Sequence, residues 1–252
     1  MRGMRAHLAR PPRPAAEPVW TSAMTAIALV GIVLSLALVP LADVAAVGLI
    51  RRSGDSVWVH AMAQITDLGK SHWYLILAIA AFLAAGLADW SSRTRKGRAW
   101  LSFVFGQAAF AFAAVALSGA LGNVVKFLVG RARPRLMDDL GSWSLDPFGF
   151  DYRFHSFPSG HSTTVGALAV VLMLWFPRAS PLILLAAIVL GASRVAAQAH
   201  YPSDVIAGLA FGFLCALWLA RWLGARAAVF RLVPGRLLPL SRHTRATRAV
   251  RA

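Results

Sequence analysis

The sequence predicts an all-α protein that spans a membrane as a bundle of six transmembrane helices. Of its 252 residues, 58% are hydrophobic, whereas soluble domains contain roughly 45–50% apolar residues. The excess lies in long, largely uncharged runs, most of which approach the roughly 20 residues that a helix needs to cross the hydrocarbon core. Backbone polar groups have no water to bind there, so such runs are expected to be helical.

Six spans are expected in order along the chain. Their predicted ranges are 21–42, 73–87, 99–125, 162–177, 181–197 and 203–223. The first run follows a basic lead and could pass for a signal peptide, because LADVAA offers small residues for cleavage. It is longer than the signal-peptide core of about 7–15 residues, so a retained anchor is favoured. The fourth run is short unless PSGHSTT belongs to the same helix.

A short helix is expected between the first two spans. Val57, Ala61 and Ile65 recur at helical spacing, which is the pattern of an amphipathic helix. Gly69 is suited to ending it. We expect residues 55–69 to form a helix that lies in the outer membrane interface.

Charge divides the chain into a membrane domain with a basic tail at each end. We expect a disordered tail over residues 1–20, the membrane domain over 21–223 and a second tail over 224–252. Both tails and the loop after the second span are rich in arginine, and an even number of spans places all three on one side. The positive-inside rule makes that side the cytoplasm. We therefore expect a multi-pass protein of a bacterial plasma membrane, with both termini in the cytoplasm.

The formal net charge of +16 would also suit a nucleic-acid-binding protein. Here the arginines cluster just outside apolar runs, where topology and anionic lipid head groups account for them more simply. We therefore expect the lipid bilayer, and not nucleic acid, as the partner, and the sequence leaves the oligomeric state open. The single cysteine, Cys215, lies inside an apolar run, and one cysteine excludes an intramolecular disulfide.

Three stretches at the ends of predicted spans carry the polar residues most able to do chemistry. They read KFLVGRARP, PSGH and SRVAAQAHYPSD, and all three fall in loops on the side opposite to the basic tails. The first stretch breaks the positive-inside trend, because it places several cations on the non-cytoplasmic side. Cations and histidines that converge at one membrane surface indicate a site for a phosphate group.

In the first stretch, Lys126 ends the third span and Arg133 follows it. A lysine at a span end is usually an interfacial anchor whose long side chain reaches the head groups. Pro134 favours an extended backbone at Arg133, which directs the arginine side chain. A guanidinium can bind two phosphate oxygens while a lysine adds a point charge, so the two residues also form a candidate phosphate site.

PSGH opens the fourth span. Ser159 can cap the helix, and Gly160 lets a ligand approach the backbone. The exposed amides of a helix N-terminus attract anions, although an ordinary helix cap accounts for a four-residue match equally well. His161 strengthens the case for a site, since an imidazole is costly in a membrane unless it has a partner or a role.

The third stretch combines a cation with a histidine–carboxylate pair. Arg194 lies near the outer end of span five, where a charged side chain is expected to face the interior of the bundle. Asp204, four residues after His200, can accept a hydrogen bond from one imidazole nitrogen and leave the other free to attack phosphorus. A purely structural histidine–aspartate pair would account for the same spacing.

The three stretches together match a known pattern. The matching residues are Lys126, Arg133, Pro134, the PSGH segment, Ser193, Arg194, His200 and Asp204. Their order and spacing resemble the three-part motif of the type 2 phosphatidic acid phosphatase family, which shares a superfamily with bacterial acid phosphatases and vanadium haloperoxidases. The resemblance covers about residues 120–210, and the six-span layout is similar to that of the membrane branch.

The resemblance implies a metal-independent lipid phosphatase that works through a phosphohistidine. His200 would be the nucleophile, Asp204 its orienting partner, and His161 the acid that protonates the leaving oxygen. The residues that would bind the phosphoryl oxygens are Lys126, Arg133, Ser159, Gly160 and Arg194. No cofactor is expected, and no carboxylate cluster suited to magnesium surrounds the motifs.

The motifs address phosphate and not the lipid tail, so several lipid phosphate substrates stay open: undecaprenyl diphosphate, phosphatidylglycerol phosphate, phosphatidate or a lipid A phosphate. The same pocket would also serve a phosphotransferase or a vanadate-dependent oxidant. A non-catalytic lipid transporter is a third hypothesis, in which Arg194 and His161 mark a translocation path. Spans one, four and six have almost no polar residues near their centres, which disfavours a transporter.

Overall fold

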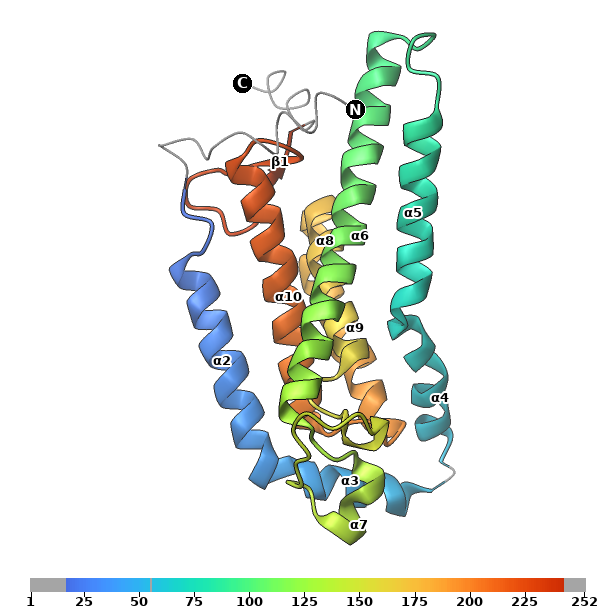
Figure 1. Cartoon of the computed structure of the whole chain (residues 1–252), viewed down its shortest axis with the longest axis vertical. Coiled ribbons are helices and arrows are strands. Elements are labelled where there is room, and N and C mark those ends of the chain that lie inside the picture. Colours follow the sequence, from blue (N-terminus) through green and yellow to red (C-terminus); the bar gives the residue numbers. More distant parts are fainter. Residues whose placement is uncertain (1–16, 55, 243–252) are drawn as a thin grey trace.

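The computed structural model describes residues 17–54 and 56–242, which form a bundle of long helices (Figure 1). The long helices are α2 (Ser22–Leu38), α5 (Ser71–Leu87), α6 (Arg95–Val129), α8 (Gly160–Trp175), α9 (Ser180–Ala196) and α10 (Pro202–Ala225). The shorter helices are η1 (Val39–Asp43), α3 (Val44–Ser53), α4 (Val57–Ile65), η2 (Thr66–Gly69), η3 (Pro134–Leu136), α7 (Met137–Leu140), η4 (Tyr152–Phe154) and η5 (Pro177–Ala179). Two short strands, β1 (Phe230–Arg231) and β2 (Leu240–Ser241), pair antiparallel.

The predicted spans are confirmed. Within the described residues, five helical segments are long and apolar enough to cross a membrane. They are Ser22–Ser53, Val57–Leu87, Arg95–Val129, Pro177–Ala196 and Pro202–Ala225. The remaining span, α8, is a shorter apolar helix of 16 residues that the PSGH segment opens, as expected. The helix expected over residues 55–69 is present as α4 and η2, and its place in the membrane interface stays a prediction. Helix α3 runs across the lower end of the bundle in Figure 1.

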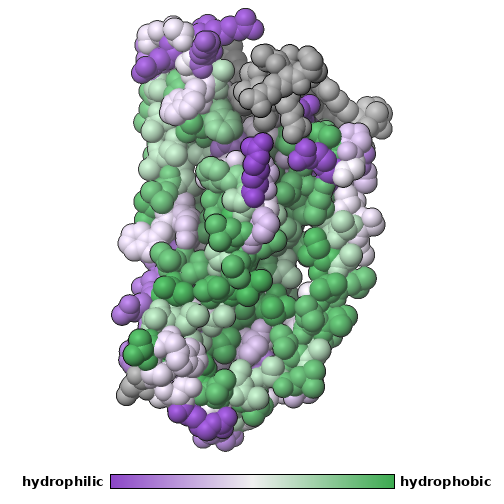
Figure 2. Space-filling view, turned by 180° about the vertical axis from the view of Figure 1, so that it is seen from behind, coloured by the Kyte–Doolittle hydropathy of each residue, from purple (hydrophilic) through white to green (hydrophobic). Residues whose placement is uncertain are grey.

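The face of the bundle shown in Figure 2 is mostly apolar at mid-height and hydrophilic at both ends. Large side chains such as Val33, Leu77 and Leu182 are 61–67% exposed, which is costly in water and favourable in a bilayer. Burial is greatest around α8 and α10, which form the most extensive helix pair. The membrane-facing and core-facing surfaces are therefore distinct.

Close packing of α8 on α10 brings two of the motifs together. A Cβ atom at Gly208 of α10 would lie 2.5 Å from the carbonyl oxygen of Ser159 and 2.9 Å from Cβ of Ser162. Only glycine admits this approach. In addition, the backbone N–H of Ser159 donates to the carbonyl oxygen of Asp204 at 3.0 Å. The start of α8 is thus fixed against the start of α10.

All three motif stretches lie at one end of the bundle, the lower end in Figure 1. There α6 ends at Val129. The next residue, Gly130, adopts the left-handed conformation (φ 60°), and the chain turns towards Arg131 and Arg133. Both α8 and α10 begin at the same end. The predicted convergence of three distant stretches on one membrane surface is therefore what the fold produces.

The opposite end holds the loop between α5 and α6 and the described residues that follow α10 (Figure 1). The hairpin of β1 and β2 packs there, with Phe230 buried against Phe110. The buried guanidinium of Arg221 donates to carbonyl oxygens from both terminal segments; the acceptors are Pro18, Val19, Arg236 and Leu237. The tail predicted over 224–252 thus packs on the bundle as far as residue 242. The rest of this tail and residues 1–16 of the first tail lie outside the described residues, and the domain boundaries stay a prediction.

Candidate active site

His200 and Asp204 are brought together by the turn that precedes α10. His200 is 2% exposed and Asp204 is fully buried. Nδ1 of His200 lies 3.8 Å from Oδ2 of Asp204, beyond the range of a hydrogen bond. This nitrogen has no other hydrogen-bond partner among the described atoms. The predicted hydrogen bond is therefore not formed in this structure, although the two groups are adjacent.

The surroundings of His200 keep its imidazole neutral. Burial lowers the pKa of His200 to about 3; Asp204 opposes this shift, while the positive charges of Lys126 and Arg133 add to it. Near neutral pH the ring therefore carries one proton and one free lone pair. A nitrogen nucleophile needs that form.

Asp204 is held by donors other than His200. Its Oδ1 accepts a hydrogen bond from Nη1 of Arg131 at 2.7 Å. Its Oδ2 accepts from Oγ of Ser156 at 2.6 Å and from the backbone N–H of Tyr201 at 2.9 Å. Arg131, which is 1% exposed, also pairs with Asp43 at 2.8 Å. Although burial opposes it, these two carboxylates raise the pKa of Arg131, so its charge is compensated.

Arg133, only two residues further on, has different surroundings. Its guanidinium donates to the carbonyl oxygens of Tyr152, His155 and Ala199 at 3.2–3.3 Å. It also lies 3.9 Å from the centre of the Tyr152 ring. No described carboxylate pairs with it, and burial lowers its pKa. The positive charge of Arg133 is therefore left uncompensated.

Lys126 and Arg194 are two further cations without counter-ions. Nζ of Lys126 donates to the carbonyl oxygen of Pro158 and, at 3.1 Å, to that of His155. Nη1 of Arg194 donates to Oγ1 of Thr66 at 2.8 Å, whereas its Nε is buried without a partner. Neither residue forms an ion pair within residues 17–54 and 56–242. Cations left unpaired in this way attract an anion such as phosphate.

His161 lies in the first turn of α8, at the same end of the bundle. Gly69 of η2 packs against its ring, because a Cβ atom at Gly69 would lie 3.1 Å from Cδ2 of the imidazole. Nε2 of His161 is buried and has no hydrogen-bond partner among the described atoms. The charge of Lys126 acts on both His161 and His200. The two imidazoles therefore border the same group of cations.

The start of α8 has the features expected of an anion site. Oγ of Ser159 caps the helix by accepting from the backbone N–H of Ser162 at 3.4 Å. A Cβ atom at Gly160 would lie 3.7 Å from Cε of Lys126, so the lysine stem lies against the first turn. The partial positive charge of the helix N-terminus adds to that of the cations.

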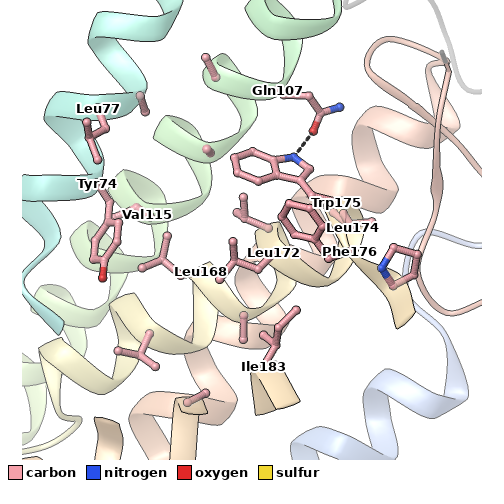
Figure 3. A pocket seen from close by; sticks show the side chains of 18 of the residues that line it. Tyr74, Leu77, Gln107, Val115, Leu168, Leu172, Leu174, Trp175, Phe176 and Ile183 are labelled. Atoms are coloured by element: carbon pink, nitrogen blue, oxygen red, sulfur yellow. Dashed lines mark hydrogen bonds between the residues drawn. The ribbon is translucent and has the colours of Figure 1, made fainter. Parts of the chain in front are cut away.

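An apolar cavity of about 890 Å³ lies away from these groups, between α5, α6, α8 and α9 (Figure 3). Leu77, Leu168 and Ile183 are among its lining residues. Its few polar groups include Trp175, whose Nε1 donates to Oε1 of Gln107 at 2.7 Å. None of the predicted site residues lines it. The cavity suits hydrocarbon, and the charged end of the bundle suits phosphate.

The structure brings all of the predicted site residues to one end and adds residues that the sequence analysis did not assign to the site. The additions are Asp43, Thr66, Arg131 and Ser156. Arg131 had a usable signal, because it lies in the first motif stretch, among cations that break the positive-inside trend. Asp43, a lone carboxylate at the end of an apolar run, gave no usable signal. Thr66 and Ser156 had none. In the part of the chain that the structure describes, no group of three His, Cys, Asp or Glu residues could hold a metal ion.

The fold and the site define an integral membrane protein with a cluster of unpaired cations beside two histidines at one end of the bundle. Comparison with known proteins adds the family: residues 107–228 match the PAP2 superfamily, and the chain belongs to it. The lipid A 1-phosphatase of Rhizobium etli is 41% identical over 170 residues, which cover 68% of this chain and 73% of that protein. The lipid A 1-phosphatase of Rhizobium johnstonii is 40% identical over 175 residues, which cover 69% and 72%.

A solved structure supports the fold. The crystal structure of a transmembrane PAP2-type phosphatidylglycerolphosphate phosphatase from Bacillus subtilis superposes with a TM-score of 0.52. The sequence identity is 21%, and the alignment covers 78% of this chain and 93% of that one. Together the comparisons confirm the predicted family, the helical membrane fold and the class of enzyme, a phosphatase of membrane lipids.

Proposed function

We propose that this protein removes the 1-phosphate of lipid A-type glycolipids at the non-cytoplasmic face of a bacterial plasma membrane, through a phosphohistidine on His200. One observation carries the proposal. Three buried or half-buried cations, Lys126, Arg133 and Arg194, lack carboxylate partners among the described residues and lie at the same end as two imidazoles. A phosphate monoester, with a charge of about −1.5 to −2, supplies the missing negative charge.

The first half-reaction transfers the phosphoryl group to the protein. Lys126, Arg133 and Arg194 bind its oxygens, helped by the helix start at Ser159 and Gly160. The lone pair on Nε2 of His200 attacks phosphorus, and the bond from phosphorus to the lipid oxygen breaks. His161 gives its proton to that oxygen, so the lipid leaves as an alcohol.

The second half-reaction releases inorganic phosphate. Water attacks the phosphorus of the phosphohistidine, and the neutral His161 takes a proton from that water. The bond between phosphorus and Nε2 breaks, and its electron pair returns to His200. Between the two half-reactions the ring of His200 is cationic, because Nε2 carries the phosphoryl group and Nδ1 carries a proton. Asp204, which lies next to Nδ1, stabilises this cationic ring.

The orientation in the membrane follows from charge. The loop between α5 and α6 and the segment after α10 are rich in arginine and lie at the end opposite the site (Figure 1). The positive-inside rule assigns that end to the cytoplasm. The site would then face the periplasm or outer surface, with both termini in the cytoplasm.

Two relatives that share about 40% identity favour a lipid A 1-phosphate as the substrate. The test is phosphate release by the purified protein from a panel of lipids: lipid A 1-phosphate, phosphatidylglycerol phosphate, undecaprenyl diphosphate and phosphatidate. We expect the first to be the best substrate, activity to persist in EDTA, and vanadate to inhibit. Activity that EDTA abolishes and magnesium restores would contradict the mechanism.

Matched histidine variants test the nucleophile. His200→Ala should lose turnover by at least about a thousandfold, because no group nearby replaces the attacking nitrogen. His60→Ala is the control, since this exposed histidine of α4 contacts the carbonyl oxygen of Ser56, the residue that precedes the helix. Acid-labile phosphate should remain on the wild-type protein after rapid quenching and be absent from His200→Ala.

Acceptor alcohols added to the assay separate a hydrolase from a phosphotransferase by their phosphorylated products.

A further inference from the structure

A fully buried carboxylate from outside the matched family segment is linked through Arg131 to Asp204, the carboxylate next to His200. Asp43 ends η1, directly after the first long helix, and is 0% exposed. Its Oδ1 accepts from the backbone N–H of Ser203 at 3.0 Å, and its Oδ2 accepts from Oγ of Ser203 at 2.5 Å. Oδ2 also pairs with Nη2 of Arg131 at 2.8 Å. The matched segment begins at residue 107, so the family motif does not include this residue.

The contacts close into a network around one guanidinium. Nη1 of Arg131 donates to Oδ1 of Asp204 and to Oγ of Ser203, both at 2.7 Å. The guanidinium lies 4.2 Å from the centre of the Tyr201 ring. Asp43 and Asp204 therefore share a single cation, and Asp204 is the carboxylate next to His200.

The network carries a net negative charge. Two carboxylates and one guanidinium sum to one excess negative charge, and all three side chains are at most 1% exposed. Water screens such charges weakly. The excess lies beside Nδ1 of His200, which is 3.8 Å from Asp204. Without the charge of Asp43, the ion pair of Arg131 and Asp204 would be neutral, and the field at the imidazole would weaken.

We propose that Asp43 is a positioning residue of the catalytic centre. Asp43 and Asp204 both pair with Arg131, so the guanidinium does not fully neutralise the negative charge of Asp204. The remaining negative charge stabilises the cationic ring that forms when Nε2 of His200 takes the phosphoryl group. The inference rests on the phosphohistidine mechanism proposed above. Asp43 acts only through Arg131 and Asp204, so it affects the reacting step and not the binding of phosphate.

Ser35 provides a matched control. It lies in α2, is 5% exposed, and its Oγ donates to the carbonyl oxygen of Ser203 at 3.0 Å. It joins the first span to the same residue of α10 as Asp43 does, yet it carries no charge. A merely structural role of Asp43 would be shared by Ser35, whereas an electrostatic role would not.

The test compares Asp43→Asn with Ser35→Ala in lipid phosphate hydrolysis. We expect Asp43→Asn to lower kcat by about 10- to 100-fold, the size expected for one unit charge several ångströms away in a protein interior. KM and inhibition by vanadate should change by less than about threefold, because the phosphate-binding cations are untouched. Ser35→Ala should keep the wild-type kcat. Equal kcat values in the two variants would overturn the inference.

A double variant separates charge from structure. Asp43→Asn combined with Arg131→Gln leaves Asp204 as the one charge of the network, so the net charge returns to its wild-type value. An electrostatic role predicts a higher kcat than in Asp43→Asn alone, whereas a structural role predicts a lower one. If Asp43→Asn alone does not fold, the double variant is compared with the wild type instead. An electrostatic role then predicts a kcat of the double variant within about tenfold of the wild-type kcat.

A measurement independent of turnover distinguishes the two proposals. The nitrogen-15 NMR signals of the His200 ring, assigned by their loss in His200→Gln, report which nitrogen carries the proton. We expect the ring signals to move in Asp43→Asn and to stay in place in Ser35→Ala. No phosphate release by the wild type from any lipid would refute the proposed function alone. Unmoved ring signals would refute the role of Asp43, whatever the activity.

Discussion

Arg131 and Arg133 are two residues apart and both buried, yet their electrostatic surroundings are opposite. Arg131 pairs with two carboxylates, Asp43 and Asp204, which raise its pKa although burial opposes them. Arg133 contacts carbonyl oxygens and an aromatic ring, and burial lowers its pKa. The difference separates two kinds of buried cation. One is balanced by counter-ions, and the other has none and, in the proposed function, binds the phosphate.

The two kinds of buried cation depend on each other. An uncompensated buried charge destabilises a fold, and here Arg133, Lys126 and Arg194 repel one another as well. The framework that Arg131 builds with Asp43 of η1 and with the start of α10 holds this end of the bundle together. A preformed positive site needs no rearrangement when phosphate arrives, which is the condition for electrostatic catalysis.

The largest expected effect comes from removing the compensated cation. Arg131→Gln leaves Asp43 and Asp204 buried without a counter-ion, and removing one partner of a buried ion pair costs about 3–5 kcal/mol. We expect the temperature of unfolding in detergent to fall by roughly 10 °C or more. Adding Asp43→Asn should recover part of this loss, because one unpaired carboxylate is then removed. An unchanged unfolding temperature in Arg131→Gln would show that the network does not hold the fold.

Removing the uncompensated cation should affect activity instead. Arg133→Gln is expected to lower kcat/KM by about 100- to 1000-fold, the cost of losing one donor to the transition-state oxygens. Its unfolding temperature should change less than that of Arg131→Gln, since no carboxylate loses a partner. Arg135→Gln is the matched control, because this exposed arginine makes the same charge change two residues away. Comparable losses in both variants would mean that overall charge, and not the site, determines the rate.

Much of the fold could be predicted because bilayer thickness constrains it. The predicted spans agree with the observed helices within a few residues at most ends; 203–223, for example, is observed as Pro202–Ala225. The motif residues could be predicted as a group, because cations and histidines at membrane depth are costly and therefore rare unless they have a function. Their convergence then followed from an even number of spans.

The contacts that hold the site residues in place could not be predicted from the spacing of residues in the sequence. Asp43 and Asp204 are joined through Arg131 across 160 residues of chain, and no local pattern reports such a contact. The hydrogen bond expected between His200 and Asp204 was inferred from spacing alone. In the structure, stronger donors from Arg131 and Ser156 occupy the carboxylate at 2.6–2.7 Å. Which donors compete for a carboxylate depends on the tertiary structure, so the spacing of residues in the sequence does not predict it.

A pH series tests how both kinds of charge act on His200. Burial lowers its pKa to about 3, whereas an unfolded histidine titrates near 6.5. The unfolded state therefore binds a proton that the native state does not. The contribution of His200 to stability is complete above pH 6.5 and is lost as the pH drops towards 3. The slope should be about 1.4 kcal/mol per pH unit. His200→Gln should show a shallower fall in unfolding temperature over the same range, and an identical slope would contradict the assignment.

The smallest effect is expected for an ion pair that differs from the Arg131 pairs mainly in exposure. Arg51 of α3 and Asp138 of α7 approach to 2.6 Å, with side chains 30% and 70% exposed. Water and salt screen such a pair, so its coupling should be at most about 1 kcal/mol and should weaken at high ionic strength. A double-mutant cycle with Arg51→Gln and Asp138→Asn measures it. A coupling as large as that of Asp43 with Arg131 would mean that burial is not what distinguishes the framework cation.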